Sequence, residues 1–143
     1  MQNPDDDTIR QILTGTHTVA VVGWSPNPER PSHGVADFLI GRGMRMIPVN
    51  PGQAGQIYAG EVIRAGLRDI PAGDKIDMVD IFRRSDAVPE IVDAALDALP
   101  GLKVIWMQLG VIHDAAAAKA RARGVIVVQD RCPKIEARRL GLI

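Results

Sequence analysis

The chain lacks the features of a secreted, membrane-spanning or metal-dependent protein. It has one cysteine, Cys132, so no internal disulfide can form, as is usual in a reducing compartment. No segment reaches the roughly 18 apolar residues of a membrane span, and the acidic start lacks the apolar core of a signal peptide. Three scattered histidines and one cysteine show no metal-ligand spacing. We therefore expect a cytoplasmic protein without membrane contact or metal.

An excess of charge of one sign is also missing. The 17 basic residues balance 17 acidic ones, which argues against a nucleic-acid partner because such binding neutralises many phosphates. Thirteen of the basic residues are arginines, whose planar guanidinium suits local phosphate recognition. Aromatic residues make up only 3%, so Val, Ile, Leu, Ala and Met must build the core.

Strand and helix patterns alternate along the whole chain. Apolar, β-branched runs predict strands over residues 17–22, 45–49, 76–82, 103–109 and 125–128. Apolar spacing and capping signals predict helices over residues 5–14, 32–41, 88–99, 115–123 and 134–140. This alternation predicts an α/β fold: a doubly wound, Rossmann-like, five-stranded and mostly parallel sheet with helices on both faces. We expect one domain over residues 1–143 and the strand order 3-2-1-4-5.

The loop after the first strand has the pattern of a phosphate-binding βα unit. The strand ends at Gly23, a polar loop with three prolines follows, and Ser32 is the expected N-cap of the next helix. The loop is not the dinucleotide fingerprint, because a single glycine follows the strand. The second strand ends in Asn50, where NAD sites place an acidic residue. Both observations argue against NAD.

Polar residues collect where the predicted strands end, which is where open α/β sheets bind ligands. Hydroxyls, amides and guanidiniums predominate, and these donors suit an anionic, phosphate-bearing ligand. We expect one of the Arg83–Arg84 pair to face the cleft and the other the solvent. Asp77 and Asp80 have no visible nucleophile as partner and are expected at solvated strand edges. The candidate ligand-binding residues are Gly23, Trp24, Ser25, Asn27, Arg30, Ser32, His33, Asn50, Pro51, Phe82, Arg83, Gln108, Gly110, Arg131 and Cys132.

Five segments together resemble the small stand-alone CoA-binding proteins, whose fold is similar to the CoA-binding domain of the succinyl-CoA synthetase α subunit. The segments are residues 21–33, 47–51, 80–85, 106–110 and 130–134. The resemblance implies CoA or an acyl-CoA as ligand, with its diphosphate in the loop from Gly23 to Ser32. It implies that Asn50 and Pro51 lie near the adenosine, that residues 81–83 flank the adenine or the start of the pantetheine, and that residues 108–110 and 131–133 line the remaining cleft.

The resemblance also implies a binding protein rather than an enzyme. The synthetase's phosphorylated histidine belongs to a further domain, and no catalytic residue is predicted here. Two alternatives stay open: a small acyl-CoA- or nucleotide-dependent transferase using Cys132 or His33, and a nucleotide-sensing or protein-interaction module that has lost the ligand. Cys132 is either a reactive thiol or a small buried residue, and Trp24 either covers the ligand or packs under the loop.

Apolar residues near the two ends of the chain leave the oligomeric state open. The helix face with Ile12 and Leu13, or the C-terminal residues Leu140, Leu142 and Ile143, would form a homodimer contact or close the monomer's own core. No motif in the sequence indicates a particular protein partner.

Overall fold

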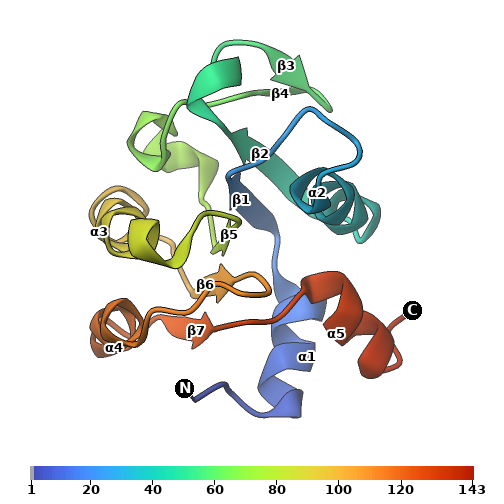
Figure 1. Ribbon diagram of the computed structural model, residues 1–143, viewed down its shortest axis with the longest axis vertical. Coiled ribbons are helices and arrows are strands. Elements are labelled where there is room, and N and C mark those ends of the chain that lie inside the picture. The colour runs from blue at the N-terminus through green and yellow to red at the C-terminus, as the bar shows by residue number, and fades with distance from the viewer. Residues whose placement is uncertain (1) are drawn as a thin grey trace.

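The computed structural model describes residues 2–143, so Met1 of the predicted domain lies outside them. The main sheet has five parallel strands: β1 (Thr18–Val22), β2 (Arg45–Val49), β5 (Met78–Ile81), β6 (Val104–Met107) and β7 (Ile126–Val128). The five α-helices of the described residues are α1 (Asp6–Gly15), α2 (Pro31–Gly41), α3 (Val88–Ala98), α4 (Asp114–Ala122) and α5 (Pro133–Arg139). Helices α3 and α4 cover one face of the sheet, and α1, α2 and α5 cover the other (Figure 1). The predicted α/β fold is confirmed.

The predicted strand order is wrong. The sheet runs β2-β1-β5-β6-β7, so its strands follow the order 2-1-3-4-5 along the chain. The loop after β2 occupies the outer edge of that strand, where the Arg64 N–H donates to the Pro48 carbonyl at 3.0 Å and the Asn50 N–H donates to the Arg64 carbonyl at 2.9 Å. Pro48 has no N–H to donate, which suits an edge strand. The third strand therefore lies on the other side of β1, and the crevice of the sheet opens between β1 and β5.

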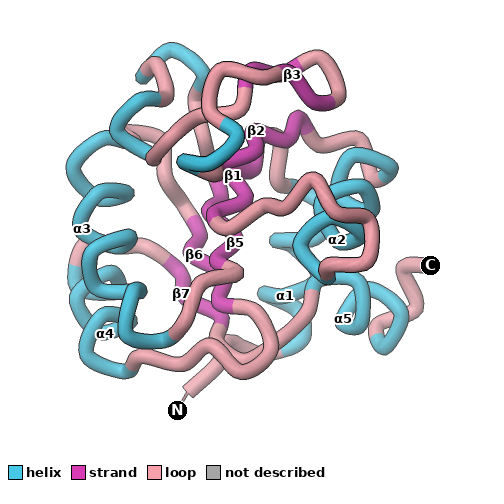
Figure 2. Tube along the Cα trace, turned by 45° about the horizontal axis from the view of Figure 1, so that its top comes forward, coloured by secondary structure: helices cyan, strands magenta, loops and turns pink. Residues whose placement is uncertain are grey.

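A small antiparallel hairpin follows this edge and was not predicted. Its strands are β3 (Ile57–Tyr58) and β4 (Glu61–Val62). Figure 2 shows the hairpin beyond the edge strand β2. Its Tyr58 packs against Trp24 of the loop from Gly23 to Ser32, hereafter the phosphate loop.

Each face of the sheet has its own apolar layer. Alternate residues of β1 point to opposite sides, Ala20 toward α3 and α4, and Val19 and Val21 toward α1, α2 and α5. The central strands are buried on both faces, as expected of a parallel sheet covered by helices. Of the described helices, none is long and apolar enough to cross a membrane.

Helix α1 and the C-terminal segment complete the second layer. Ile12 and Leu13 are buried within the monomer, and Leu140 and Leu142 pack against the same apolar cluster. These residues therefore close the core of one chain, which is one of the two roles expected for them.

Asp77 and Asp80 are buried, so their expected place at solvated strand edges is wrong. The Asp77 carboxylate accepts hydrogen bonds from the His17 N–H at 2.9 Å and the Thr18 N–H at 2.8 Å, which holds the start of β1 against β5. Asp80 is 0% exposed, and neither carboxyl oxygen has a partner among the described residues. Burial raises the pKa of Asp80 well above its ordinary value.

Candidate functional site

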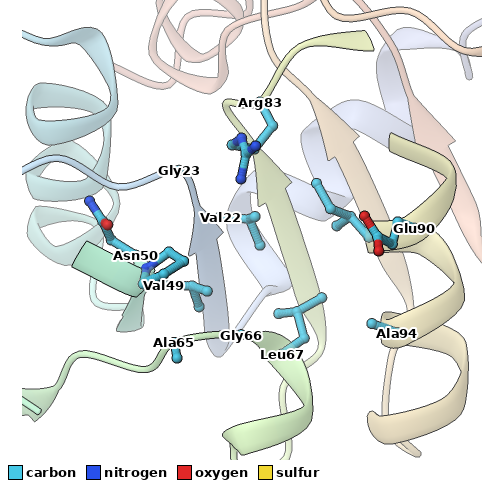
Figure 3. Close-up of a pocket in the computed structure, with 12 residues that line it drawn as sticks. Val22, Gly23, Val49, Asn50, Ala65, Gly66, Leu67, Arg83, Glu90 and Ala94 are labelled. Carbon is cyan, nitrogen blue, oxygen red and sulfur yellow. The ribbon is translucent and has the colours of Figure 1, made fainter. Parts of the chain in front are cut away.

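Two adjoining cavities open at the carboxyl ends of β1, β2 and β5. The larger has a volume of about 570 Å³ and the smaller about 360 Å³, within the size range of small-molecule sites. Gly23 and Asn50 line both. The other residues of the larger cavity (Figure 3) are Val22, Val49, Pro51, Ala65, Gly66, Leu67, Arg83, Glu90, Ile91 and Ala94. The others of the smaller cavity are Trp24, Ser25, Arg30, Pro31, Ser32 and Phe82.

The phosphate loop is held in shape by its own side chains. The Asn27 N–H donates to the Ser25 hydroxyl at 3.1 Å, and the Asn27 carboxamide oxygen accepts from the Glu29 N–H at 3.0 Å. The Arg30 N–H donates to the Asn27 carbonyl at 3.0 Å. Such local hydrogen bonds stabilise turns. They restrict the conformation of the loop in addition to its three prolines. Asn27, a predicted ligand residue, shapes this loop and does not line either cavity.

Gly23 is required where β1 ends. Its φ of +87° lies in the left-handed region, and an added Cβ would be 3.1 Å from the Phe82 carbonyl oxygen and 3.3 Å from the Arg83 Cδ. Its N–H donates to the Val49 carbonyl at 3.1 Å. The absent side chain thus lets the loop turn tightly between the ends of β2 and β5.

Helix α2 begins at this loop without a side-chain cap. Arg30 is the N-cap residue and Pro31 the first helical residue, so the predicted N-cap role of Ser32 is wrong. No side chain caps the start of the helix. Pro31 has no N–H, and the His33 N–H donates to the Arg30 carbonyl at 3.0 Å. The Ser32 side chain lines the smaller cavity. The positive end of the helix dipole therefore favours an anion here.

Two arginines line the cavities and have no acidic partner among the described residues. Arg30 lines the smaller cavity and Arg83 the larger, and neither forms an ion pair with any residue in the range 2–143. Figure 3 shows the Arg83 guanidinium turned toward Gly23. Arg84 instead is 80% exposed and pairs with Asp86 at 3.2 Å. One member of the pair faces the cleft and the other the solvent, as predicted.

Asn50 joins the two walls of the site. Its side-chain nitrogen donates to the Trp24 carbonyl at 2.8 Å, and its side-chain oxygen accepts from the Gly52 N–H at 2.8 Å. Both ends of the carboxamide are therefore engaged within the protein. Asn50 fixes the phosphate loop to the end of β2 and shapes both cavities.

An aromatic cluster supports the phosphate loop from beneath. Trp24 is 1% exposed, and its ring centroid is 5.7 Å from that of His33 and 4.8 Å from that of Tyr58. His33 Nδ1 lies 2.9 Å from the Ser25 carbonyl oxygen, and Nε2 lies 3.3 Å from the Tyr58 hydroxyl. That hydroxyl donates to Asp37 at 2.5 Å, a bond that raises the pKa of Tyr58 to about 12. Trp24 thus packs under the loop, and His33 engages the protein with both ring nitrogens.

The remaining predicted residues lie at the ends of β6 and β7 and are not among the residues that line either cavity. Gln108 and Cys132 are buried, Gly110 follows β6, and Arg131 pairs with Glu136 at 3.0 Å. These four residues share the carboxyl edge of the sheet with the cavities, where the Gln108 N–H donates to the Ile81 carbonyl at 3.1 Å. Within the described chain no group of His, Cys, Asp and Glu residues is arranged to hold a metal ion.

Part of the larger cavity was missed from the sequence. Ala65, Gly66 and Leu67 come from the long loop after β2, and Glu90 comes from the first turn of α3. A signal for Glu90 was available, because α3 follows β5 and its first turn must lie at the ligand edge of the sheet. No comparable signal marks the loop residues.

The parallel sheet with cavities at its carboxyl edge defines a Rossmann-like α/β protein with the flavodoxin-like strand order. The model of the CoA binding domain family matches residues 17–138, and the chain belongs to this family. The resemblance found in the sequence is thereby confirmed.

Three similar proteins cover nearly the whole chain. The uncharacterized protein YneT of Bacillus subtilis (strain 168) is 33% identical over 135 residues, which are 94% of this chain and 96% of YneT. A hypothetical protein from Pyrococcus horikoshii OT3 has a solved structure with 35% identity and a TM-score of 0.86, covering 98% of this chain and 96% of that one. The structure of cell-free ID.343 from Thermus thermophilus has 32% identity and a TM-score of 0.87, covering 96% and 99%.

Proposed function

We propose that this protein binds CoA or an acyl-CoA and holds it without catalysing a reaction. One observation carries the proposal: a cavity with an unpaired guanidinium and an uncapped helix start adjoins a second cavity with an apolar floor. The diphosphate and the adenosine of CoA have the matching chemistry. Membership of the CoA binding domain family supports the same ligand.

The smaller cavity suits the diphosphate. Arg30 offers a charged, bidentate donor, and Ser25 and Ser32 add hydroxyls. Pro31 and Ser32, in the first turn of α2, line the same cavity, and the helix dipole favours negative charge there. The rigid loop keeps these donors in place before the ligand arrives, which reduces the ordering cost of binding.

The larger cavity suits the adenosine. Val22, Val49, Leu67 and Ile91 supply apolar surface for a flat base. Arg83 lies where this cavity meets Gly23 and the phosphate loop, so its charge is available to a phosphate between the two parts of the ligand. NAD is disfavoured because Asn50, at the end of β2, has its carboxamide engaged and no acidic group stands there for the ribose hydroxyls.

The absence of catalysis is supported by the composition of the cavities. Within the described chain neither lining contains a histidine or a cysteine. His33 is engaged by Ser25 and Tyr58, and Cys132 is buried at the start of α5. A transferase that used either residue would need the ligand to reach beyond both cavities.

Calorimetric titration with CoA, acetyl-CoA, NAD and NADP tests the proposal. We expect CoA or acetyl-CoA to bind. Arg30→Ala should weaken this binding about tenfold, which corresponds to the lower end of the free energy contributed by a hydrogen bond to a charged group. Arg84→Ala is the matched control, because it removes an exposed arginine that faces away from the cleft.

Two outcomes contradict the proposal. Failure of all four ligands to bind would favour a module that has lost its ligand. Turnover of acetyl-CoA by the wild-type protein, followed by chromatography and abolished by Cys132→Ala, would instead identify a transferase.

A further inference from the structure

His33, in the first turn of α2, lies between the phosphate loop and the hairpin of β3 and β4. Its side chain is only 12% exposed. Its Nδ1 atom is 2.9 Å from the Ser25 carbonyl oxygen. Its Nε2 atom is 3.3 Å from the Tyr58 hydroxyl and 3.5 Å from Asp37 Oδ2. Each ring nitrogen therefore faces oxygen atoms.

These oxygens determine where the ring must carry hydrogen. A carbonyl oxygen only accepts, so Nδ1 must donate to Ser25. The Tyr58 hydroxyl has one hydrogen and donates it to Asp37 Oδ1 at 2.5 Å. This bond raises the pKa of Tyr58 to about 12, so the hydroxyl keeps its hydrogen near neutral pH. Toward Nε2 the hydroxyl can then only accept. Both ring nitrogens donate, and a histidine does so only as the charged imidazolium.

A neutral His33 ring satisfies fewer of these contacts. With its hydrogen on Nδ1, the ring keeps the bond to Ser25, but the Nε2 lone pair faces the oxygens of Tyr58 and Asp37. With its hydrogen on Nε2, the ring turns the Nδ1 lone pair toward the Ser25 carbonyl oxygen. Each neutral form therefore loses one contact. Histidine is the side chain that ordinarily changes charge between about pH 5 and pH 8, so the network depends on pH in that range.

The Ser25 carbonyl connects this network to the smaller cavity. Ser25 lines the cavity, whereas His33 does not. The bond to Nδ1 fixes the Ser25 carbonyl against the ring, and so fixes the backbone of a lining residue. The Ser25 hydroxyl oxygen accepts from the Asn27 N–H at 3.1 Å, which leaves the hydroxyl hydrogen available to a ligand. The protonation of His33 is thus coupled to the shape of the proposed diphosphate site.

The charges around the ring are few. Among the described residues, Asp37 of α2 and Tyr58 of β3 are the titratable groups that contact it. The other charged residues of the phosphate loop and the hairpin are Glu29, Arg30 and Glu61. Glu61 pairs with Arg45 at 2.8 Å, and Arg30 lines the smaller cavity. A charged His33 therefore adds to the positive potential at the end of the site where Arg30 lies.

We propose that His33 is a positioning residue for the anionic ligand. In its imidazolium form it holds the phosphate loop in the binding conformation and adds positive charge at the Arg30 end of the site. Ligand affinity therefore falls when the ring loses its proton. This inference rests on the proposed function, in which the diphosphate occupies the smaller cavity. By reciprocity, ligand binding must favour protonation of the ring to the same extent.

Calorimetric titration of the full-length protein with dephospho-CoA at pH 5.5 and pH 7.5 tests the inference. Dephospho-CoA keeps the diphosphate but lacks the 3′-phosphate, a group that itself ionises near pH 6 and would change the charge of the ligand. We expect the wild-type protein to bind dephospho-CoA about fivefold more tightly at pH 5.5, the effect of about one hydrogen bond.

Two variants assign this pH dependence to one side chain. His33→Gln should bind dephospho-CoA with the same affinity at both pH values, because a carboxamide can donate to the Ser25 carbonyl but does not titrate. His17→Gln is the matched control and should keep the fivefold difference, because His17 is exposed and precedes β1 at the opposite edge of the sheet.

A second measurement needs no variant. At pH 6.5 the binding of dephospho-CoA to the wild-type protein should take up protons. Proton uptake is measured as a binding enthalpy that changes with the ionisation enthalpy of the buffer. A merely structural role of His33 would lower affinity in the variant but would produce neither proton uptake nor a pH dependence that the variant removes.

Each other result overturns the inference. Equal wild-type affinity at the two pH values, absence of proton uptake, a pH dependence that His33→Gln retains, or one that His17→Gln also removes would each exclude this role of His33 and leave CoA binding intact. Binding of CoA without binding of dephospho-CoA would exclude it too, because the diphosphate would then not be the group recognised. If neither ligand binds, the proposed function fails, and the inference fails with it.

Discussion

Replacing Asp80 should change how the stability of this protein depends on pH. Asp80 lies in the middle of the sheet, paired in register with Val21 on β1 and Trp106 on β6, and is fully buried. Burial raises its pKa well above the ordinary value, because the charged form loses its hydration. The native protein therefore keeps the proton at pH values where the unfolded chain, with a pKa of about 3.9, releases it.

The direction and size of the effect follow from this difference in bound protons. For a raised pKa, the stability that the group contributes is fully present below the unfolded pKa and is lost as the pH rises toward the native pKa. Within that window the native state binds one proton more, so the free energy of unfolding falls by about 1.4 kcal/mol per pH unit. Asp80→Asn and Asp80→Leu both remove this contribution. Their stability relative to wild type should therefore rise by about 1.4 kcal/mol per pH unit.

Urea unfolding at pH 4.5 and pH 5.5, followed by far-UV circular dichroism, measures this slope. Titration of every other group is common to the compared proteins and cancels in the difference. The free energies of unfolding of the two variants should differ by a constant amount, because asparagine is polar and leucine is not. Their change with pH relative to wild type should be the same. A difference from wild type that is the same at both pH values would refute the reasoning and show that Asp80 is ionised in the native state.

Two further predictions concern the ends of β1. Gly23→Ala should destabilise the protein by about 1–2 kcal/mol because of its left-handed backbone, and by a further amount because the new Cβ would contact Phe82. Gly43→Ala is the control, because Gly43 has a similar φ of +93° but open space around an added Cβ. Equal losses of stability for the two variants in urea unfolding would show that the contact with Phe82 costs nothing. Asp77→Ala should cost about 2–3 kcal/mol, because two backbone N–H groups at the start of β1 lose their acceptor; an unchanged thermal midpoint would contradict this role.

The helices and strands of the main sheet could be predicted because their signals are local. Helix α3, for example, repeats apolar residues at helical spacing and has Pro89 in its first turn. Strand β2 was predicted with the bounds found in the structure, Arg45–Val49. The hairpin of β3 and β4 was missed because two-residue strands in a Gly-rich segment carry almost no periodicity.

The strand order could have been predicted from one residue. Pro48 lies in β2, and a proline in the interior of a sheet would break the hydrogen-bond ladder. An order with β2 inside the sheet was therefore disfavoured from the start. The alternation of strands and helices alone did not distinguish the two orders, since both obey the handedness of parallel crossovers.

The candidate site was predicted in part. Gly23, Arg30, Asn50 and Arg83 line the cavities as residues at strand ends and in the following loop were expected to. Glu90 was not predicted, although the first turn of α3 belongs to the same edge of the sheet. Whether a residue at that edge faces the ligand or its own loop depends on side-chain packing, which spacing along the chain does not report.

The sequence by itself determined the class of fold, the family and the edge of the sheet where a ligand belongs. These properties follow from periodicity, turn residues and short motifs, each of which acts over a few neighbouring residues. The tertiary structure decided the strand order, the burial of Asp80, the engagement of His33 and Asn50 within the protein, and the cavity that Glu90 lines together with Arg83. The reason is physical: these features depend on contacts between segments that are distant along the chain, and each is set by the packing of the whole domain.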